Sequence, residues 1–385
     1  MEKKLRILNA SNIFFTLPYF FGDQLTYFTD KGYDITLVCS PDSKLKPFAE
    51  KHRCHYKEIY VPRVIAPLQA LKSTWELYKY IRKEKFDIVC GHTPSGALVT
   101  IIAAWLCGVK KRVFFRRGLV YETSHGLRRK MMVGAEKLTS MLATKVACVS
   151  PYLVERSVQD GLTPREKMVI FNNGSGNGVD ALGFYNRANL DKEKLSEIKA
   201  KWDIPEDAFV IGYSGRMVQD KGIEELVAAF KIISAKYPKA ILLLVGMLEE
   251  RDAVTPETVN EIRTNPKIIH TGQIYGGMEY YYTLMDVMVL CTHREGFGSS
   301  ILQASAMEVP VLTTGHTGSR DAIRENVTGM FVTMNDANSI VEKVQMYIED
   351  EELRQKHGRQ GREFILNYFQ QELVWDDIEK KVYLS

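Results

Sequence analysis

The feature that most constrains the fold of this chain is the alternation of short apolar runs with longer stretches of helical periodicity. In the first half, runs rich in β-branched and aromatic residues recur, and the intervals carry apolar residues at the spacing of an amphipathic helix. The predicted strands are 5–8, 35–39, 87–90, 112–115, 145–149 and 168–171, and the predicted helices are 22–30, 67–84, 95–106 and 126–143. Strands that alternate with helices form βαβ units, which predict a parallel sheet covered by helices.

The same alternation starts again after a charged stretch at 189–205, which has few bulky apolar residues and is predicted to be the linker region. Here the predicted strands are 209–213, 240–245, 268–271, 287–291, 309–313 and 329–332, and the predicted helices are 222–237, 256–263, 278–286, 300–307, 337–348 and 351–366. A length of 385 residues suits two domains. We therefore predict an α/β protein with two Rossmann-like parallel-sheet domains facing across a cleft, with ligands at the carboxyl ends of the strands.

Several protein classes lack support because their signatures are missing. Neither half has GxGxxG after its first strand, and GxxxxGK[ST] occurs nowhere, which argues against a nicotinamide enzyme and a P-loop ATPase. The glycine-rich segment 171–180 precedes no helical pattern, so a turn is favoured over a phosphate cradle. The longest apolar stretch, 96–109, is too short to span a bilayer, and no signal-peptide core follows the first residues. Six cysteines without a CxxC pair are typical of reduced thiols, so we expect a cytoplasmic location.

Charge is divided unevenly between the halves. Residues 1–187 contain 29 Lys and Arg against 16 Asp and Glu, which leaves 22 basic and 31 acidic residues in 188–385, or net charges of +13 and −9. The basic half also has an aromatic loop at 13–22 and cationic clusters at 110–112, 116–117 and 128–130. Such a surface attracts anionic headgroups, so we hypothesise peripheral binding to the inner face of the cell membrane; the alternative is a solvated face over core aromatics. No recognised nucleic-acid module is present, and nucleic acid is not an expected partner.

The most informative segment for function is 291–314, CTHREGFGSSILQASAMEVPVLTT. A predicted strand ends there, Glu295 and two glycines occupy the loop, and Ser299 or Ser300 can begin the next helix. Glycines let a ligand approach the backbone, and free NH groups at a helix start favour an anion. The arrangement suits a diphosphate; the alternative is an ordinary loop with Glu295 in solvent.

A second candidate site follows the first strand of the second half, in GYSGRMVQDKGIEELVAAF. Arg216 and Lys221 flank a short loop before a helix. Both cations can therefore converge on one pair of phosphates, Arg216 as a bidentate fork and Lys221 as a point charge. The alternative is two basic side chains that are simply solvated.

Taken together, these segments resemble the retaining nucleotide-sugar glycosyltransferases of family 4, which have the GT-B fold. The resemblance rests on an ordered series across 208–349: GR with lysine at the fifth position after the arginine, LLLVG, REGFG, AMEVPVLTT and GSRDAIRENVTGMFV. The first half agrees through LTYFTDKGYDITLVCSPD, APLQALKSTWELYKYIRKEKFDIVCGHTPSGALV and ATKVACVSPYLVE, which look like the acceptor-side domain of members that build bacterial surface polysaccharides. The resemblance implies an acceptor-side domain at 1–187, a nucleotide-sugar domain at 188–364, and a helix within 365–385 that returns to the first domain.

The resemblance also implies an activity. A hexosyltransferase-type enzyme would move a sugar, with retention, from a nucleoside-diphosphate sugar, in the first instance a UDP-sugar, to a polyprenyl-linked saccharide. Arg216 and Lys221 would neutralise the leaving diphosphate, and Glu295 would hold hydroxyls of the donor sugar. The implied donor-binding set is Arg216, Lys221, Ile274 near the nucleobase, Glu295, Gly298, Ser299 and Gln303. No metal or cofactor is implied, because two cations and helix-start NH groups can stabilise a leaving group electrostatically.

Two positions depart from the family pattern. Gln303 stands where relatives usually have a second glutamate that contacts the ribose, and an amide still hydrogen-bonds hydroxyls but without charge. Arg117 stands where many relatives have a histidine near the reacting centre; as a catalytic candidate it supplies a cation but no proton relay. His92, at a predicted strand end, is a candidate on the acceptor side. Two alternatives stay open: a donor-binding protein with impaired catalysis, and an enzyme similar to the UDP-N-acetylglucosamine 2-epimerases.

Overall fold

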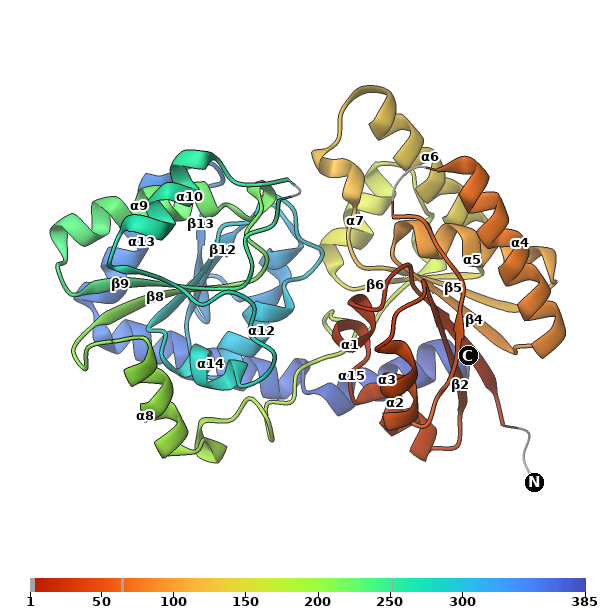
Figure 1. Ribbon diagram of the computed structural model, residues 1–385, viewed down its shortest axis with the longest axis horizontal. Coiled ribbons are helices and arrows are strands. Elements are labelled where there is room, and N and C mark those ends of the chain that lie inside the picture. Colours follow the sequence, from red (N-terminus) through yellow and green to blue (C-terminus); the bar gives the residue numbers. More distant parts are fainter. Residues whose placement is uncertain (1–3, 64–65, 251) are drawn as a thin grey trace. The chain divides into compact units, whose positions relative to one another are not determined.

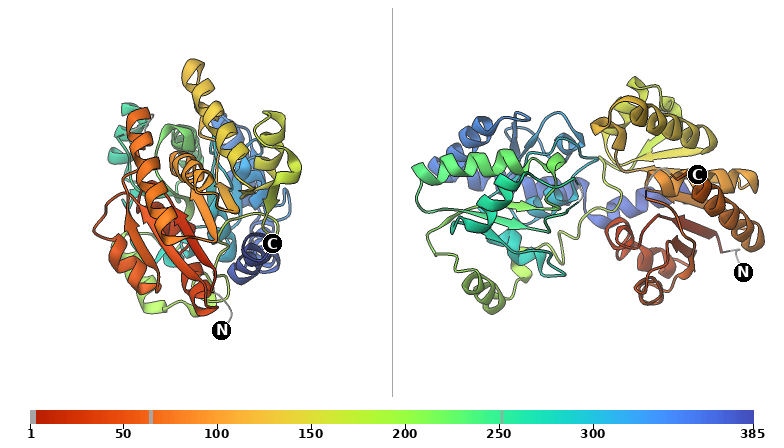
Figure 2. Two further views of the ribbon diagram at one scale, coloured as in Figure 1. Left: turned by 90° about the vertical axis from the view of Figure 1, so that its right-hand side faces the viewer. Right: turned by 45° about the horizontal axis from the view of Figure 1, so that its top comes forward.

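The computed structural model describes residues 4–63, 66–250 and 252–385 of the chain. Two compact units are present, and each is described by itself (Figure 1). Unit 1 comprises Met1–Asn177 with Val374–Ser385, and unit 2 comprises Gly178–Leu373. Both are parallel sheets covered by helices, so the predicted α/β class with two Rossmann-like sheets is confirmed (Figure 2).

Unit 1 is built on seven parallel strands in the order β3-β2-β1-β4-β5-β6-β7. The strands are β1 (Arg6–Ala10), β2 (Asp34–Cys39), β3 (His55–Glu58), β4 (Ile88–His92), β5 (Lys111–Arg116), β6 (Lys145–Cys148) and β7 (Met168–Ile170). The α-helices are α1 (Thr16–Phe20), α2 (Gln24–Asp30), α3 (Leu45–Lys51), α4 (Pro67–Glu84), α5 (Pro94–Leu106), α6 (Gly126–Leu142) and α7 (Pro151–Gln159). The strand order reverses at β1, which pairs with β2 and β4. Ligands bind beside such switch points in open α/β sheets.

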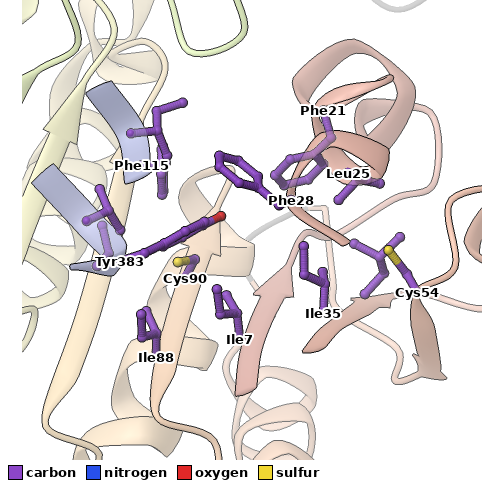
Figure 3. Close-up of a cluster of buried hydrophobic side chains, with 14 of the residues drawn as sticks. Ile7, Phe21, Leu25, Phe28, Ile35, Cys54, Ile88, Cys90, Phe115 and Tyr383 are labelled. Atoms are coloured by element: carbon purple, nitrogen blue, oxygen red, sulfur yellow. The ribbon is translucent and has the colours of Figure 1, made fainter. Parts of the chain in front are cut away.

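The C-terminal segment completes the core of unit 1. The helix α15 (Gln371–Ile378) is followed by a π-helical turn, Glu379–Tyr383. Tyr383 is buried among apolar side chains of the sheet and of α2, including Phe28 and Cys90 (Figure 3). Trp375 belongs to the same cluster, and its indole Nε1 donates to the carbonyl of Asn177 over 2.8 Å. Burial of these side chains fastens the end of the chain to the first sheet.

Unit 2 has six parallel strands in the order β10-β9-β8-β11-β12-β13. The strands are β8 (Phe209–Ser214), β9 (Ala240–Val245), β10 (Ile268–His270), β11 (Val287–Leu290), β12 (Val311–Thr314) and β13 (Gly329–Val332). The α-helices are α8 (Lys192–Lys201), α9 (Ile223–Lys236), α10 (Pro256–Thr264), α11 (Met278–Thr283), α12 (Ser299–Ala306), α13 (Ala337–Glu349) and α14 (Glu351–Tyr368). The order again reverses at its first strand, β8, which pairs with β9 and β11.

Several details differ from the sequence predictions, among them the helices α1, α3 and α7, which were not predicted. The units divide after Asn177 rather than after 187, because the following segment packs on unit 2, where the Arg362 guanidinium donates to the carbonyls of Ala181 and Tyr185. The predicted linker at 189–205 contains the helix α8. The edge strand β3 was not predicted, because all four of its residues are exposed and it has no apolar run. Among the helices that the structure describes, none is both long enough and apolar enough to cross a membrane.

Candidate active site

The first group of candidate residues lies in the loop that joins β8 to α9. Arg216 is exposed, and its Nη1 lies 3.2 Å from Oε2 of Glu249. The hydroxyl of buried Tyr213 donates to the Arg216 carbonyl over 2.7 Å, which fixes the backbone of the loop. Lys221 ends the short 3₁₀ turn Gln219–Lys221 directly before α9. The two cations therefore lie on one loop, but each has its own carboxylate partner.

Lys221 pairs with Glu295 from the loop after β11. The Nζ of Lys221 lies 2.7 Å from Oε2 of Glu295 and donates to the Arg294 carbonyl over 3.2 Å. The lysine and glutamate side chains are 14% and 24% exposed, so the pair is shielded yet reachable. Their sequence separation of 74 residues is bridged because β8 and β11 are neighbours in the sheet, and residues that follow neighbouring parallel strands meet at one edge. The structure thus joins two residues to which the sequence assigned separate roles.

The start of α12 lies beside this pair. Gly298 is the N-cap residue with φ +89°, a left-handed conformation that favours glycine, and no side chain caps the helix. A Cβ at Gly298 would lie 2.9 Å from Cδ1 of Ile301 and 3.7 Å from Cγ of Glu295, so the backbone passes close to the carboxylate. Ser299, the first helical residue, is exposed. The first NH groups of a helix have no partner within the helix, and this uncapped start suits an anion.

Gln303 lies one turn further along α12 and belongs to a buried hydrogen-bonded chain. Its Oε1 accepts from the hydroxyl of Tyr282 over 2.9 Å, and the same hydroxyl lies 3.1 Å from Oγ of Ser214 at the end of β8. Tyr282 was missed in the sequence because its run YYYT reads as the apolar face of a helix. Ile274 is half-buried in the loop after β10, where its carbonyl accepts from Nε2 of Gln273 over 3.3 Å.

Two further ion pairs surround the loops and were also missed. Asp220 Oδ2 accepts from Arg294, and His293 Nε2 lies 2.7 Å from Oε1 of Glu225. The hydrogen bond to Glu225 raises the pKa of His293 above its ordinary value. These pairs tie the β8–α9 loop to the β11–α12 loop, so the candidate residues rest on a rigid frame.

The two remaining candidates belong to unit 1. His92, the last residue of β4, is completely buried, and its Nε2 lies 3.1 Å from Oδ1 of Asn9. Burial, and in second place the charge of Arg117, lower the pKa of His92 well below its ordinary value. His92 exposes no surface, and its predicted role on the acceptor side stays a prediction. Arg117, directly after β5, is partly exposed and packs over the ring of Phe20 at 4.1 Å.

Comparison with known proteins identifies the family. Residues 195–364 match the family of glycosyl transferases group 1, and residues 5–150 match the glycosyl transferase 4-like family. The chain is 33% identical over 377 residues to the capsular polysaccharide biosynthesis glycosyltransferase CapM of Staphylococcus aureus, covering 98% of this chain and 96% of CapM. It is 23% identical over 349 residues to the UDP-Gal:alpha-D-GlcNAc-diphosphoundecaprenol alpha-1,3-galactosyltransferase of Escherichia coli, covering 88% and 86% of the two chains.

Solved structures agree at the level of the fold. Anabaena Alr3699/HepE, solved in complex with UDP and glucose, superposes with a TM-score of 0.83 at 16% identity over 99% of this chain and all of HepE. A glycosyltransferase of Rickettsia africae superposes with a TM-score of 0.81 at 21% identity over 99% of each chain. With family matches in both halves and a relative at 33% identity over nearly its whole length, the chain belongs to the glycosyltransferases and has the GT-B fold.

Proposed function

We propose that this glycosyltransferase moves a hexosyl group from a UDP-sugar, with retention of anomeric configuration and without a metal ion, to a lipid-linked saccharide in surface polysaccharide synthesis. The observation that carries the donor assignment is the Lys221–Glu295 pair beside the uncapped start of α12. Two relatives support the UDP-sugar donor, the lipid-linked acceptor and the pathway: CapM acts in capsular polysaccharide biosynthesis, and the E. coli enzyme uses UDP-Gal and a diphosphoundecaprenol-linked acceptor.

The residues present can perform the transfer. As the sugar–phosphate bond breaks, negative charge develops on the diphosphate, where the Lys221 ammonium and the first NH groups of α12 stabilise it. When Lys221 turns to the phosphate, Oε2 of Glu295 is released for a hydroxyl of the donor sugar, while Oε1 continues to accept from the Gly296 NH. Arg216 lies on the same loop as Lys221, and its exposed guanidinium can exchange Glu249 for a phosphate oxygen.

The test is transfer from a panel of nucleotide-sugars in the presence of EDTA, with the anomeric configuration of the product read by NMR. We expect Lys221→Met and Glu295→Gln to reduce kcat by at least about a hundredfold, the loss typical of one electrostatic group at a transition state. Lys231→Met and Glu261→Gln are matched controls, because these residues form an ion pair on the outside of the same unit. Activity that requires a divalent metal, or wild-type rates in the first two variants, would refute the proposal. Epimerisation of the donor without acceptor would favour the alternative enzyme class.

The outer surface of α4, α5 and α6 supports a membrane-held acceptor, because it has the composition of a membrane-binding surface. The loop at 13–22 contributes less to this surface than the sequence suggests. Leu17 and Phe21 of that loop are buried in the core, as is Arg116 of the 116–117 cluster. The exposed large apolar side chains of the three helices are Leu68, Leu71, Trp75, Trp105, Leu106, Leu127, Met131, Leu138 and Met141. Exposed Lys and Arg on α4 and α6 lie among them, whereas no Asp or Glu of these two fully described helices is exposed. This mixture of apolar and basic side chains suits an anionic bilayer surface.

Co-sedimentation with vesicles tests the proposed binding to an anionic membrane. We expect binding to phosphatidylglycerol-containing vesicles, weakened about twentyfold or more by Lys72→Glu with Lys79→Glu, because each cation near the surface contributes about 1 kcal/mol. Trp75→Ser should weaken binding as well. Ile232→Ser and Lys356→Glu, exposed positions on unit 2, are the matched controls. Equal binding to neutral and to phosphatidylglycerol-containing vesicles, or no binding to either, would refute the proposed membrane contact.

A further inference from the structure

Two consecutive arginines at the end of β5 have opposite surroundings. Arg116 is completely buried, and every part of its guanidinium has a partner. Its Nη2 lies 3.1 Å from Oε2 of Glu136 and donates to the hydroxyl of Ser140, and its Nη1 donates to the hydroxyls of Ser157 and Thr163. Because successive side chains of a strand point to opposite faces, Arg117 does not share this network. Arg116 therefore has a structural role, and Arg117 requires another explanation.

Arg117 has no counter-ion among the residues that the structure describes. Its guanidinium lies over the ring of Phe20 at 4.1 Å and 5.6 Å from the centre of Phe115, and Nη2 donates only a long hydrogen bond, 3.5 Å, to the Phe20 carbonyl. A Cβ at Gly176 would lie 2.4 Å from its Nη1, so the guanidinium sits against backbone with no room for a side chain there. Burial lowers the pKa of Arg117 to about 9. A shielded cation without a partner is costly, and its neighbours hold it in place without neutralising it.

Unsatisfied polar atoms gather near this cation. Of the ten buried side-chain nitrogen and oxygen atoms without a hydrogen-bond partner in the described residues, four belong to Asn9, Asn12, His92 and Arg117. These residues come from the carboxyl ends of β1, β4 and β5, beside the reversal of strand order. Most buried polar atoms in proteins have a partner, so a concentration of unpaired ones indicates a place where water or a ligand belongs.

The start of α5 belongs to the same edge. Thr93 caps this helix of 13 residues with φ +61°, an unusual value for a β-branched residue, and its side chain makes no capping hydrogen bond. A Cβ at Gly96 would lie 3.2 Å from the backbone nitrogen of Asn12, so the β1 loop and the helix start are in close contact. The helix start and the unpaired Nδ1 of the fully buried His92 are independent observations that both favour a bound polar group.

We propose that Arg117 is the oxyanion-binding residue of unit 1, with a phosphate or a sugar carboxylate of a substrate as its missing counter-ion. A planar guanidinium matches both groups through paired hydrogen bonds. Phe20 and Phe115 orient the guanidinium, and His92, bonded to Asn9, positions Phe115, on whose ring it stacks at 4.5 Å. Arg117 then determines specificity: it selects an acceptor or a donor that carries a negative charge at this point.

Two substrates can bring this charge, and the choice between them rests on the proposed function. The diphosphate of a polyprenyl-linked acceptor is one source, and the carboxylate of a uronic sugar is the other. Binding of the oxyanion itself needs no turnover, so a binding experiment fails or succeeds independently of the transfer reaction.

The experiment is titration calorimetry on the full chain, with Arg216→Ala and Lys221→Met included to remove the cations of unit 2. The probes are farnesyl diphosphate with farnesol as the neutral control, and glucuronate with glucose as the neutral control. We expect one charged probe to bind, with affinity reduced about tenfold to a hundredfold in Arg117→Gln and less in Arg117→Lys, as for the loss of a charged hydrogen bond. Arg63→Gln, an exposed arginine of the same unit, is the matched control.

The outcomes are distinct. Arg117-dependent binding of farnesyl diphosphate assigns the site to the acceptor, and Arg117-dependent binding of glucuronate assigns it to an acidic sugar. A Tm of Arg117→Gln at or above that of the wild type shows that the variant folds. Binding of neither charged probe, equal affinity of wild type and Arg117→Gln, or equal loss in Arg63→Gln would overturn the proposal.

Discussion

Replacing Arg116 with methionine should destabilise unit 1 strongly and in a pH-dependent manner. The variant keeps a long side chain but leaves the carboxylate of Glu136, 3% exposed, without its cation. Breaking a buried ion pair by removing one partner costs about 3–5 kcal/mol of the free energy of unfolding. Burial already raises the pKa of Glu136 above its ordinary value of 4.5 despite the opposing charge of Arg116, and without that charge the pKa rises further.

The sign of the pH dependence follows from proton binding. Between 4.5 and the raised folded pKa, the folded state of the variant holds a proton on Glu136 that the unfolded state releases. Stability therefore falls as pH rises through this window, and the loss relative to wild type should be smaller at pH 5 than at pH 8. Adding Glu136→Leu should restore about 2 kcal/mol or more, because no buried charge then remains.

The assay is guanidinium denaturation followed by tryptophan fluorescence in a Trp202→Phe background. The remaining tryptophans, Trp75, Trp105 and Trp375, all belong to unit 1, so the signal follows that unit in a protein whose two units need not unfold together. Arg117→Met in the same assay should change stability by less than about 1 kcal/mol, because the lost stacking on Phe20 and the lost long hydrogen bond to its carbonyl are offset by removal of an unpaired cation. Equal losses at pH 5 and pH 8, or a double variant as unstable as Arg116→Met, would refute the reasoning.

Three further predictions concern the second unit and the chain end. Gln303→Glu keeps the acceptor for the Tyr282 hydroxyl and adds charge, so UDP affinity measured by calorimetry should rise severalfold; unchanged affinity would remove this position from the donor site. Gly246→Ala places a Cβ 1.9 Å from the Gly215 carbonyl oxygen at φ +140°, and should lower the stability of unit 2 by about 2 kcal/mol or more in denaturant titration; a neutral result would show that the loop relaxes freely. Trp375→Ala should lower the free energy of unfolding of unit 1 by about 3–5 kcal/mol, as measured by thermal unfolding. A smaller loss would mean that the chain end is not part of the core of this unit.

The fold was largely predictable because buried strands and amphipathic helices carry their signal locally. The predicted bounds at 67–84, 240–245 and 329–332 coincide with α4, β9 and β13. Two missed elements, β3 and α8, have no buried side, whereas the short helices α1, α3 and α7 were missed although each buries apolar residues. The helix α8 buries no residue and is held by its cap, where Asp191 accepts from the backbone of Glu193 over 2.9 Å and of Lys194 over 3.2 Å. A cap of this kind stabilises a helix whose apolar periodicity is too weak to be recognised.

For the candidate site, the sequence predicted which residues lie at the carboxyl edge of the sheet, but it did not predict which of their side chains form ion pairs. Parallel strands bring their carboxyl ends to one edge, so residues after β8 and β11 were expected near a ligand. Which side chains pair depends on rotamers and loop geometry, and no sequence pattern predicted that Lys221 contacts Glu295 or that Arg216 contacts Glu249. The sequence also did not predict the different environments of Arg116 and Arg117. An RR dipeptide shows neither which residue faces the core nor which one lies opposite a carboxylate.

In the proposed function, the Lys221–Glu295 pair also affects how the donor is recognised. A phosphate that captures Lys221 removes the cation from Glu295, and a shielded carboxylate left with only the Gly296 NH is unfavourable. The sugar hydroxyls of an intact donor can supply new hydrogen bonds to Glu295, whereas UDP alone cannot. The pair therefore couples recognition of the phosphate to recognition of the sugar, and it opposes binding of the nucleotide product. Because Arg117 has no carboxylate to release, an anion bound there would carry no such penalty. The two proposals therefore assign different modes of binding to the two units: a donor that displaces an ion pair in unit 2, and a charged group bound directly by a cation in unit 1.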